Sequence, residues 1–255
     1  MIKACAAFVA AGMLVASGCS PDTDRGLDSP SSESRIVVDV YAAASLSGVF
    51  MELATAYESA HPNVDIVLTF AGSSELATHI LEGAPADVFA AADVEVMDLV
   101  SADVVGDTAV FATNQLTIAV PAGNPAGVTG IESLARPDLL VVMCAPSVPC
   151  GSAAANAQES YGVSINAASE ELNVTDVLGK VASGEADAGL VYVTDIARAR
   201  GVEAVALGSV PLTANQYPIA AMTTGDAAEA GQGFVDFVLS NVGRATLADA
   251  GFGLP

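Results

Sequence analysis

Short apolar runs rich in β-branched residues alternate along this chain with stretches in which apolar residues recur at helical spacing. The first run, residues 36–41, reads Ile-Val-Val-Asp-Val-Tyr, and after Ser45 the apolar side chains fall three and four positions apart. The first pattern is typical of a strand and the second of an amphipathic helix. A second apolar run follows at 64–70, just after Pro62. The order predicts a strand–helix–strand unit in which the proline ends the helical region.

The same alternation continues to the C-terminus. Further strands are predicted at residues 87–90, 116–120, 139–143, 188–193, 202–207 and 217–220. Further helices are predicted after the turn at 71–74 and over 152–160, 174–181 and 227–250. Strands and helices of this length, in this order, indicate an α/β fold with mostly parallel sheets flanked by helices. Crossovers near 117–120 and 216–220 would divide it into two lobes.

The N-terminal segment differs from the rest of the chain. Lys3 is followed by a run of apolar and small residues shorter than the ~20 that a membrane-spanning helix needs. These features predict a secretory signal over residues 1–18. Ala16-Ser17-Gly18-Cys19 resembles the bacterial lipobox, whose cysteine is lipidated, but Ala16 stands where Leu is usual, so ordinary signal-peptidase cleavage is the alternative. Residues 19–34, rich in Ser, Asp and Pro, predict a flexible tether after the lipidated Cys19.

The charge balance narrows the possible functions. The chain has 30 Asp plus Glu against 8 Lys plus Arg, a formal net charge of −22. Binding to nucleic acid needs a basic surface, so that class is excluded. The predicted secretory signal and the lipobox-like run lead us to expect an exported protein, anchored by lipid to the cell membrane and facing the periplasm or the extracellular side.

Two cysteines, Cys144 and Cys150, fall in the part of the chain predicted to fold. In an oxidising compartment two cysteines this close in sequence favour a disulfide. A metal site would need more ligands, and His61 and His79 are not at ligand spacing. We predict a Cys144–Cys150 disulfide, which over so short a loop contributes roughly 2 kcal/mol.

Three predicted strand-to-helix turns carry hydroxyls or free backbone amides. They are Ala43-Ala44-Ser45-Leu46, Ala71-Gly72-Ser73-Ser74 and Val148-Pro149-Cys150-Gly151. The start of a helix presents unpaired N–H groups and the positive end of the helix dipole, which suits an anion. Taken singly, each serine is more simply explained as a helix N-cap. An anion site would need several of these turns to meet between the lobes.

Several runs resemble periplasmic molybdate-binding proteins and follow one another in the same order. They are residues 41–46, 70–77, 83–89, 189–195 and 217–220. The likeness extends from about Ile36 to the C-terminus. It implies a two-lobed periplasmic-binding-protein (type II) fold in which an oxyanion lies in the cleft between the lobes. Lobe 1 would comprise residues 35–118 plus 217–255, and lobe 2 residues 119–216.

The resemblance also implies a set of ligand-binding residues. Ser45 and Ser73 would each give a hydroxyl and a backbone N–H to the anion from lobe 1. From lobe 2, Cys150 and Val174 would give backbone N–H groups and Tyr192 its phenolic hydroxyl. Molybdenum would then be bound only as molybdate, through these residues, and no cofactor is expected.

None of these five residues carries a charge, and no arginine is expected near the motifs. Gly72 stands where relatives often have Ser, so one possible secondary contact to the anion is absent. A site made only of donors suits molybdate, tungstate or sulfate, whereas phosphate keeps a proton at neutral pH and needs an acceptor. We expect a monomeric, non-enzymatic substrate-binding component of a molybdate or tungstate ABC importer, with a membrane permease as partner. The alternatives are a binding protein for another tetrahedral oxyanion such as sulfate, or, less favoured, a hydrolase of small anionic esters.

Overall fold

The structure is a computed structural model and describes residues 35–255. The predicted signal peptide, the tether and the candidate lipidation site Cys19 lie outside the described residues. Within residues 35–255, no helix has the length and apolar character needed to span a membrane.

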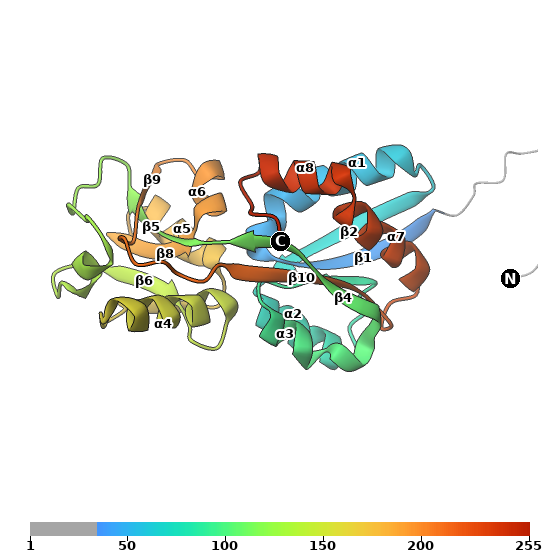
Figure 1. Ribbon diagram of the computed structural model, residues 1–255, viewed down its shortest axis with the longest axis horizontal. Helices are drawn as coiled ribbons and strands as arrows, with labels where there is room; N and C mark the ends of the chain where they lie inside the picture. The colour runs from blue at the N-terminus through green and yellow to red at the C-terminus, as the bar shows by residue number, and fades with distance from the viewer. Residues whose placement is uncertain (1–34) are drawn as a thin grey trace, which may run out of the picture. The chain divides into compact units, whose positions relative to one another are not determined.

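Lobe 1 is built on a five-stranded sheet with the order β2-β1-β3-β10-β4 (Figure 1). Helices α1, α7 and α8 cover one face of this sheet, and α2 and α3 cover the other (Figure 1). The strands are β1 (Ile36–Ala43), β2 (Val64–Ala71), β3 (Val88–Ala90), β4 (Val104–Asn114) and β10 (Asn215–Met222). The helices are α1 (Ser47–Ala60), α2 (Ser73–Leu81), α3 (Val94–Leu99), α7 (Ala228–Leu239) and α8 (Asn241–Asp249), with the 3-10 turns η1 (Ala44–Leu46) and η2 (Ser101–Asp103).

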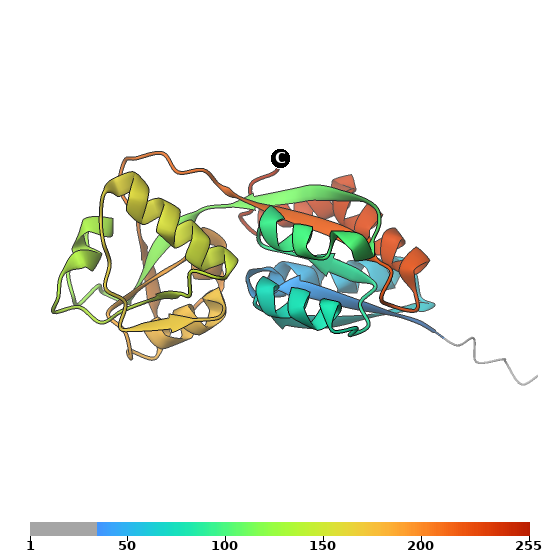
Figure 2. The ribbon, with the colours of Figure 1, turned by 90° about the horizontal axis from the view of Figure 1, so that it is seen from below.

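Lobe 2 is built on a second five-stranded sheet with the order β7-β6-β8-β5-β9. Helix α4 packs on one face, and α5 and α6 pack on the other (Figures 1 and 2). The strands are β5 (Leu116–Pro121), β6 (Val141–Cys144), β7 (Ser169–Glu171), β8 (Ala188–Tyr192) and β9 (Val202–Val205). The helices are α4 (Pro149–Tyr161), α5 (Val174–Ala182) and α6 (Val193–Arg198), with the 3-10 turn η3 (Ile131–Ala135).

Alternation of side chains along the strands gives each sheet an apolar core on both faces. In β5, Ile118 and Val120 are fully buried against the α4 side, whereas Ala119 between them is buried against the α5 side. Successive residues of a strand point to opposite faces, so a continuous apolar run requires cover on both. This explains why the strands read as unbroken apolar stretches in the sequence.

The predicted two-lobed α/β architecture is present, but the sheets are mixed and not mostly parallel. In the described part of the chain, β1 pairs in parallel with β2 and β3, whereas β10 pairs antiparallel with β3 and β4. In lobe 2, β6 pairs in parallel with β7 and β8, whereas β5 pairs antiparallel with β8 and β9. A helical crossover from a neighbouring strand enforces the parallel direction. Strands β10 and β5 are free of that constraint because they arrive from the other lobe.

The chain passes from the sheet of lobe 1 to that of lobe 2 at Gln115, between β4 and β5, and returns in β10, which begins at Asn215. The sequence predicts crossovers near 117–120 and 216–220.

The predicted helix over 227–250 needs correction, because it is two helices broken at Ser240. The Ser240 side chain accepts a hydrogen bond from the Gly243 N–H at 3.3 Å and caps α8, so the chain restarts a helix there.

Candidate ligand-binding site

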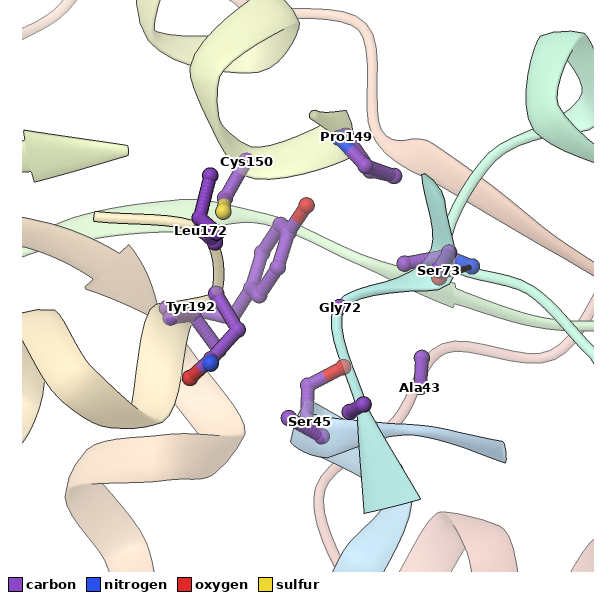
Figure 3. Close-up of a pocket in the computed structure, with 13 residues that line it drawn as sticks. Ala43, Ser45, Gly72, Ser73, Pro149, Cys150, Leu172 and Tyr192 are labelled. Atoms are coloured by element: carbon purple, nitrogen blue, oxygen red, sulfur yellow. Dashed lines mark hydrogen bonds between the residues drawn. The ribbon is translucent and has the colours of Figure 1, made fainter. Parts of the chain in front are cut away.

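One cavity is lined by residues from both lobes, and all five residues expected to contact a ligand line it (Figure 3). Ser45 and Ser73 come from lobe 1, and Cys150, Val174 and Tyr192 come from lobe 2. The thirteen lining residues are Ala43, Ala44, Ser45, Ala71, Gly72, Ser73, Ala92, Pro149, Cys150, Leu172, Asn173, Val174 and Tyr192. None of these thirteen carries a charged side chain.

The cavity is small. Its volume is about 20 Å³, where about 10–15 Å³ is enough for one water molecule. The space therefore suits a compact solute of a few heavy atoms and excludes a peptide or a sugar chain.

The cavity lies where strands end and helices begin. Strands β1, β2, β6 and β7 lead respectively into η1, α2, α4 and α5, and the first residues of those elements face the cavity. Ligands in open α/β sheets bind at these carboxyl ends of strands. In the described turns before α2 and α4, the N-caps Gly72 and Val148 make no side-chain cap bond. At the start of α5, the Asn173 side chain accepts a hydrogen bond from Asp176 N at 3.0 Å. This cap does not use the N–H of Val174, which is left for another acceptor.

The two serines are buried, and each has a hydrogen-bond partner behind it. Ser73 is 2% exposed, and its Oγ accepts a hydrogen bond from Ala92 N at 3.0 Å. Ser45 is equally buried, and its Oγ lies 3.0 Å from the Tyr217 hydroxyl. Burial raises the pKa of Tyr217, which keeps it a phenol that can donate to Ser45. Ser73 accepts from behind, so its own hydrogen is free to donate into the cavity; the Ser45 hydroxyl can do the same when Tyr217 is the donor of their hydrogen bond.

The Tyr192 hydroxyl is supported in the same way. Its oxygen accepts a hydrogen bond from Asn215 Nδ2 at 2.9 Å, and the residue is 1% exposed. Burial, together with Tyr217 and the carboxylates of Asp195 and Asp93, raises the pKa of Tyr192 well above its ordinary value of 10.0. The phenol is therefore protonated throughout the physiological range and can act only as a neutral donor to an anion.

One buried carboxylate lies beside the cavity without lining it. Asp195 is 4% exposed, and its Oδ2 accepts a hydrogen bond from Tyr192 N at 3.0 Å at the start of α6. Burial raises the pKa of Asp195 to about 7, although the hydrogen bond from Tyr192 and the charge of Arg198 act in the opposite direction. This carboxylate supports the backbone that carries Tyr192.

The expectation that no arginine lies near the motifs is wrong. Arg198 Nη2 donates a hydrogen bond of 2.9 Å to the carbonyl oxygen of Ser45. In the sequence Arg198 is only six positions after Tyr192, but it reaches Ser45 from the other lobe. Only the fold brings the two together.

Further contacts join the two lobes around the cavity. Ser74 Oγ donates to the carbonyl oxygen of Ser147 at 3.0 Å. A Cβ atom on Gly72 would lie 2.4 Å from the carbonyl oxygen of Leu172, so only glycine fits there. The space beside Gly72 is thus filled by the backbone of lobe 2, so the two lobes are in contact beside the cavity. Beside it, Cys144 and Cys150 form a disulfide that joins the end of β6 to the start of α4.

Residues 38–253 match the family model for bacterial extracellular solute-binding proteins. The chain belongs to this family. Among the relatives of this solute-binding protein, the molybdate-binding protein ModA of Mycobacterium tuberculosis is 40% identical over 252 residues, which cover 98% of this chain and 95% of that protein. The predicted resemblance to molybdate-binding proteins is therefore confirmed, and membership of an extracellular family indicates export.

Solved structures share the fold of this solute-binding protein. The periplasmic molybdate-binding protein of Azotobacter vinelandii superimposes with a TM-score of 0.73 at 20% identity, covering 86% of this chain and 99% of that one. The sulfate-binding protein SubI from Mycobacterium tuberculosis superimposes with a TM-score of 0.75 at 17% identity, covering 86% of each chain. At these identities the likeness speaks for the fold alone, and it confirms the two-lobed α/β prediction.

The residues that support the donors in this solute-binding protein were not predicted from its sequence. Tyr217 lies within a run that resembles the family, which is the one signal pointing to it. Asn215 and Arg198 carry no such signal. Asn215 matters because it holds the Tyr192 hydroxyl, and Arg198 because it holds the Ser45 carbonyl.

Proposed function

We propose that this protein is the extracytoplasmic substrate-binding component of a molybdate or tungstate ABC importer. The observation that carries the proposal is a small cavity between the lobes with an uncharged lining. Three hydroxyls line it, those of Ser45, Ser73 and Tyr192, and each has a hydrogen-bond partner behind it. The choice of anion is supported by the relative that is 40% identical over 98% of this chain and is named a molybdate-binding protein.

A donor-only cavity selects by protonation state. Molybdate, tungstate and sulfate carry no proton at neutral pH, so every oxygen can accept a hydrogen bond. Phosphate is largely monoprotonated, and its O–H would meet another donor in this cavity. Leaving buried groups unmatched costs ~1–3 kcal/mol each, which would weaken phosphate binding by about 5- to 150-fold per mismatch.

Calorimetry with molybdate, tungstate, sulfate and phosphate tests the proposal. We expect tight 1:1 binding of molybdate and tungstate, much weaker binding of sulfate, and weaker binding still of phosphate. Sulfate affinity comparable to that of molybdate would assign the protein to sulfate instead. Absence of binding to all four anions would refute oxyanion capture altogether.

We further infer that the protein acts by binding and not by catalysis, as a monomer that delivers its anion to a membrane permease. Its relatives are solute-binding proteins. Chromogenic phosphate and sulfate esters should therefore stay intact when incubated with the protein. Ester hydrolysis that disappears in Ser73→Ala would favour the hydrolase alternative. The oligomeric state is measured separately, by light scattering during size-exclusion chromatography.

Lipid anchoring at Cys19 is part of the same proposal. The lipobox-like run ending at Cys19 supports it, and the exported family is consistent with it. The mature protein should partition with membranes and carry a lipid-modified N-terminal cysteine by mass spectrometry. The Cys19→Ser variant should be released from the membrane, and a wild-type protein found wholly unmodified in the soluble exported fraction would rule the anchor out.

A further inference from the structure

Arg198, the last residue of α6, reaches from lobe 2 to lobe 1. Its Nη2 donates a hydrogen bond of 2.9 Å to the carbonyl oxygen of Ser45. The same nitrogen lies 3.8 Å from Oδ1 of Asp195, one turn earlier on α6. Because a guanidinium presents several N–H groups in a fixed plane, one side chain can serve a carbonyl and a carboxylate together.

These contacts connect two cavity residues that belong to different lobes. Asp195 uses its other oxygen, Oδ2, to accept the N–H of Tyr192 at 3.0 Å. A continuous link therefore runs from the Ser45 carbonyl through the Arg198 guanidinium and the Asp195 carboxylate to the Tyr192 backbone. Arg198 itself does not line the cavity, so the guanidinium holds the lobes without touching the solute.

Gly48, in the first turn of α1, makes room for the guanidinium. A Cβ at this position would lie 1.7 Å from Arg198 Nη1 and 2.7 Å from its Cδ and Cζ. Glycine is a poor helix former, yet here any larger side chain would displace the arginine. The bare backbone of lobe 1 is thus complementary to the arginine of lobe 2.

We propose that Arg198 is an interlobe latch, a positioning residue that holds the closed state and slows release of the bound solute. This inference rests on the proposed function, because it assumes that the cavity closes around an anion. The latch forms only when the lobes meet and makes no contact with the ligand. Its loss should therefore speed the release of molybdate and tungstate in the same proportion and leave their relative affinities unchanged.

Release can be measured by loading the protein with molybdate, mixing it with excess tungstate, and quantifying retained molybdenum by mass spectrometry after rapid filtration. Arg198→Ala should release molybdate about tenfold faster, the loss expected for one partly exposed charge-assisted hydrogen bond. Arg198→Lys should fall between Arg198→Ala and wild type, because an ammonium keeps the charge but not the planar geometry. Arg200→Ala, which removes the same charge from a neighbouring exposed position, is the matched control and should release at the wild-type rate.

A double-mutant cycle separates a latch from a general structural role. Gly48→Ala should speed release in the wild-type background but have little effect in Arg198→Ala, because both changes remove the same contact. Gly179→Ala, a helical glycine of α5 with no described atom within 4 Å of an added Cβ, controls for helix propensity. Thermal unfolding without ligand should be similar in all variants.

The possible results lead to different conclusions. If the wild-type protein binds molybdate but Arg198→Ala releases it at the wild-type rate, the latch is overturned and the proposed function is not. Additive effects of Gly48→Ala and Arg198→Ala, or a changed ratio of molybdate to tungstate affinity, would also overturn it. Wild-type protein that binds neither anion would overturn the proposed function and the latch with it.

Discussion

Gly72 offers a way to perturb lobe closure without changing any donor to the solute. Its backbone angles, φ −61° and ψ 135°, are those of an ordinary extended residue, so alanine fits lobe 1 without strain. A Cβ on Gly72 would, however, lie 2.4 Å from the carbonyl oxygen of Leu172 in lobe 2. Gly72→Ala should therefore disfavour the closed state and leave the separate lobes intact.

The size of the effect follows from this distance. Ordinary contacts begin at 3.4 Å, so the lobes must separate by about 1 Å at this point. Hydrogen bonds of about 2.9 Å that are stretched by this amount fall outside the bonding range. Losing one charge-assisted bond to the solute costs about 1.5–3 kcal/mol, which corresponds to a rise in Kd of roughly 10- to 150-fold.

Calorimetric titration of molybdate into Gly72→Ala, wild type and Gly179→Ala measures this loss. The control adds the same methyl group where no described atom lies within 4 Å, and its Kd should equal that of wild type. Urea unfolding of ligand-free Gly72→Ala should change by no more than about 1 kcal/mol, the difference between glycine and alanine as an N-cap. A Kd for Gly72→Ala within threefold of wild type would show that the Gly72–Leu172 contact does not govern closure, and the reasoning would fail.

Three further predictions concern single groups. Ser73→Ala should raise the Kd for molybdate by roughly 10- to 100-fold in calorimetry, since it removes one hydroxyl donor to the charged solute; an unchanged Kd would remove this hydroxyl from the site. The raised pKa of Asp195, about 7 against 3.8, means that the folded state holds its proton more tightly, so stability is lost as pH rises from about 4 to about 7. Asp195→Asn keeps an acceptor for the Tyr192 N–H without the charge. In urea unfolding, the stability of this variant relative to wild type should therefore rise by up to about 4 kcal/mol between pH about 4 and about 7. A difference that does not change with pH would contradict the raised pKa of Asp195. Replacing Cys144 and Cys150 together by serine should lower the free energy of unfolding by about 2 kcal/mol, and a loss below 0.5 kcal/mol would show that the bond adds little.

Local patterns predicted most of the strands and helices because burial on both faces of a sheet leaves continuous apolar runs. Strand β4 was not predicted, since Gly106 and Asp107 interrupt its pattern and it lies at the edge of its sheet. Helix α6 was missed because residues 193–198 are too few to show helical periodicity. The break at Ser240 was missed because one capping serine hardly alters the apolar spacing on either side of it.

The candidate site could be assembled from sequence only through a resemblance. Spacing identified the turns that contain Ser45, Ser73 and Cys150, but it could not show that they face one cavity. Asn215 and Arg198 act through contacts with residues 23 and 153 positions away, respectively Tyr192 and Ser45, and such pairings are set by tertiary packing. The polar groups that touch a solute leave motifs in a sequence, whereas those that orient them leave almost none.

A net charge of −22 does not prevent a chain from holding an anion when, as here, no charged side chain lines the cavity. Polar groups around the cavity are oriented before the solute arrives: Asn215 and Ala92 fix the acceptor sides of Tyr192 and Ser73, and three helices begin at its wall. Dipoles that are already oriented need no reorganisation on binding and act over short distances. Surface carboxylates act across water and are screened within about 10 Å at 0.1 M salt. Selectivity is therefore set by the hydroxyls and amides at the cavity, and the charge outside it affects mainly the rate at which the anion approaches.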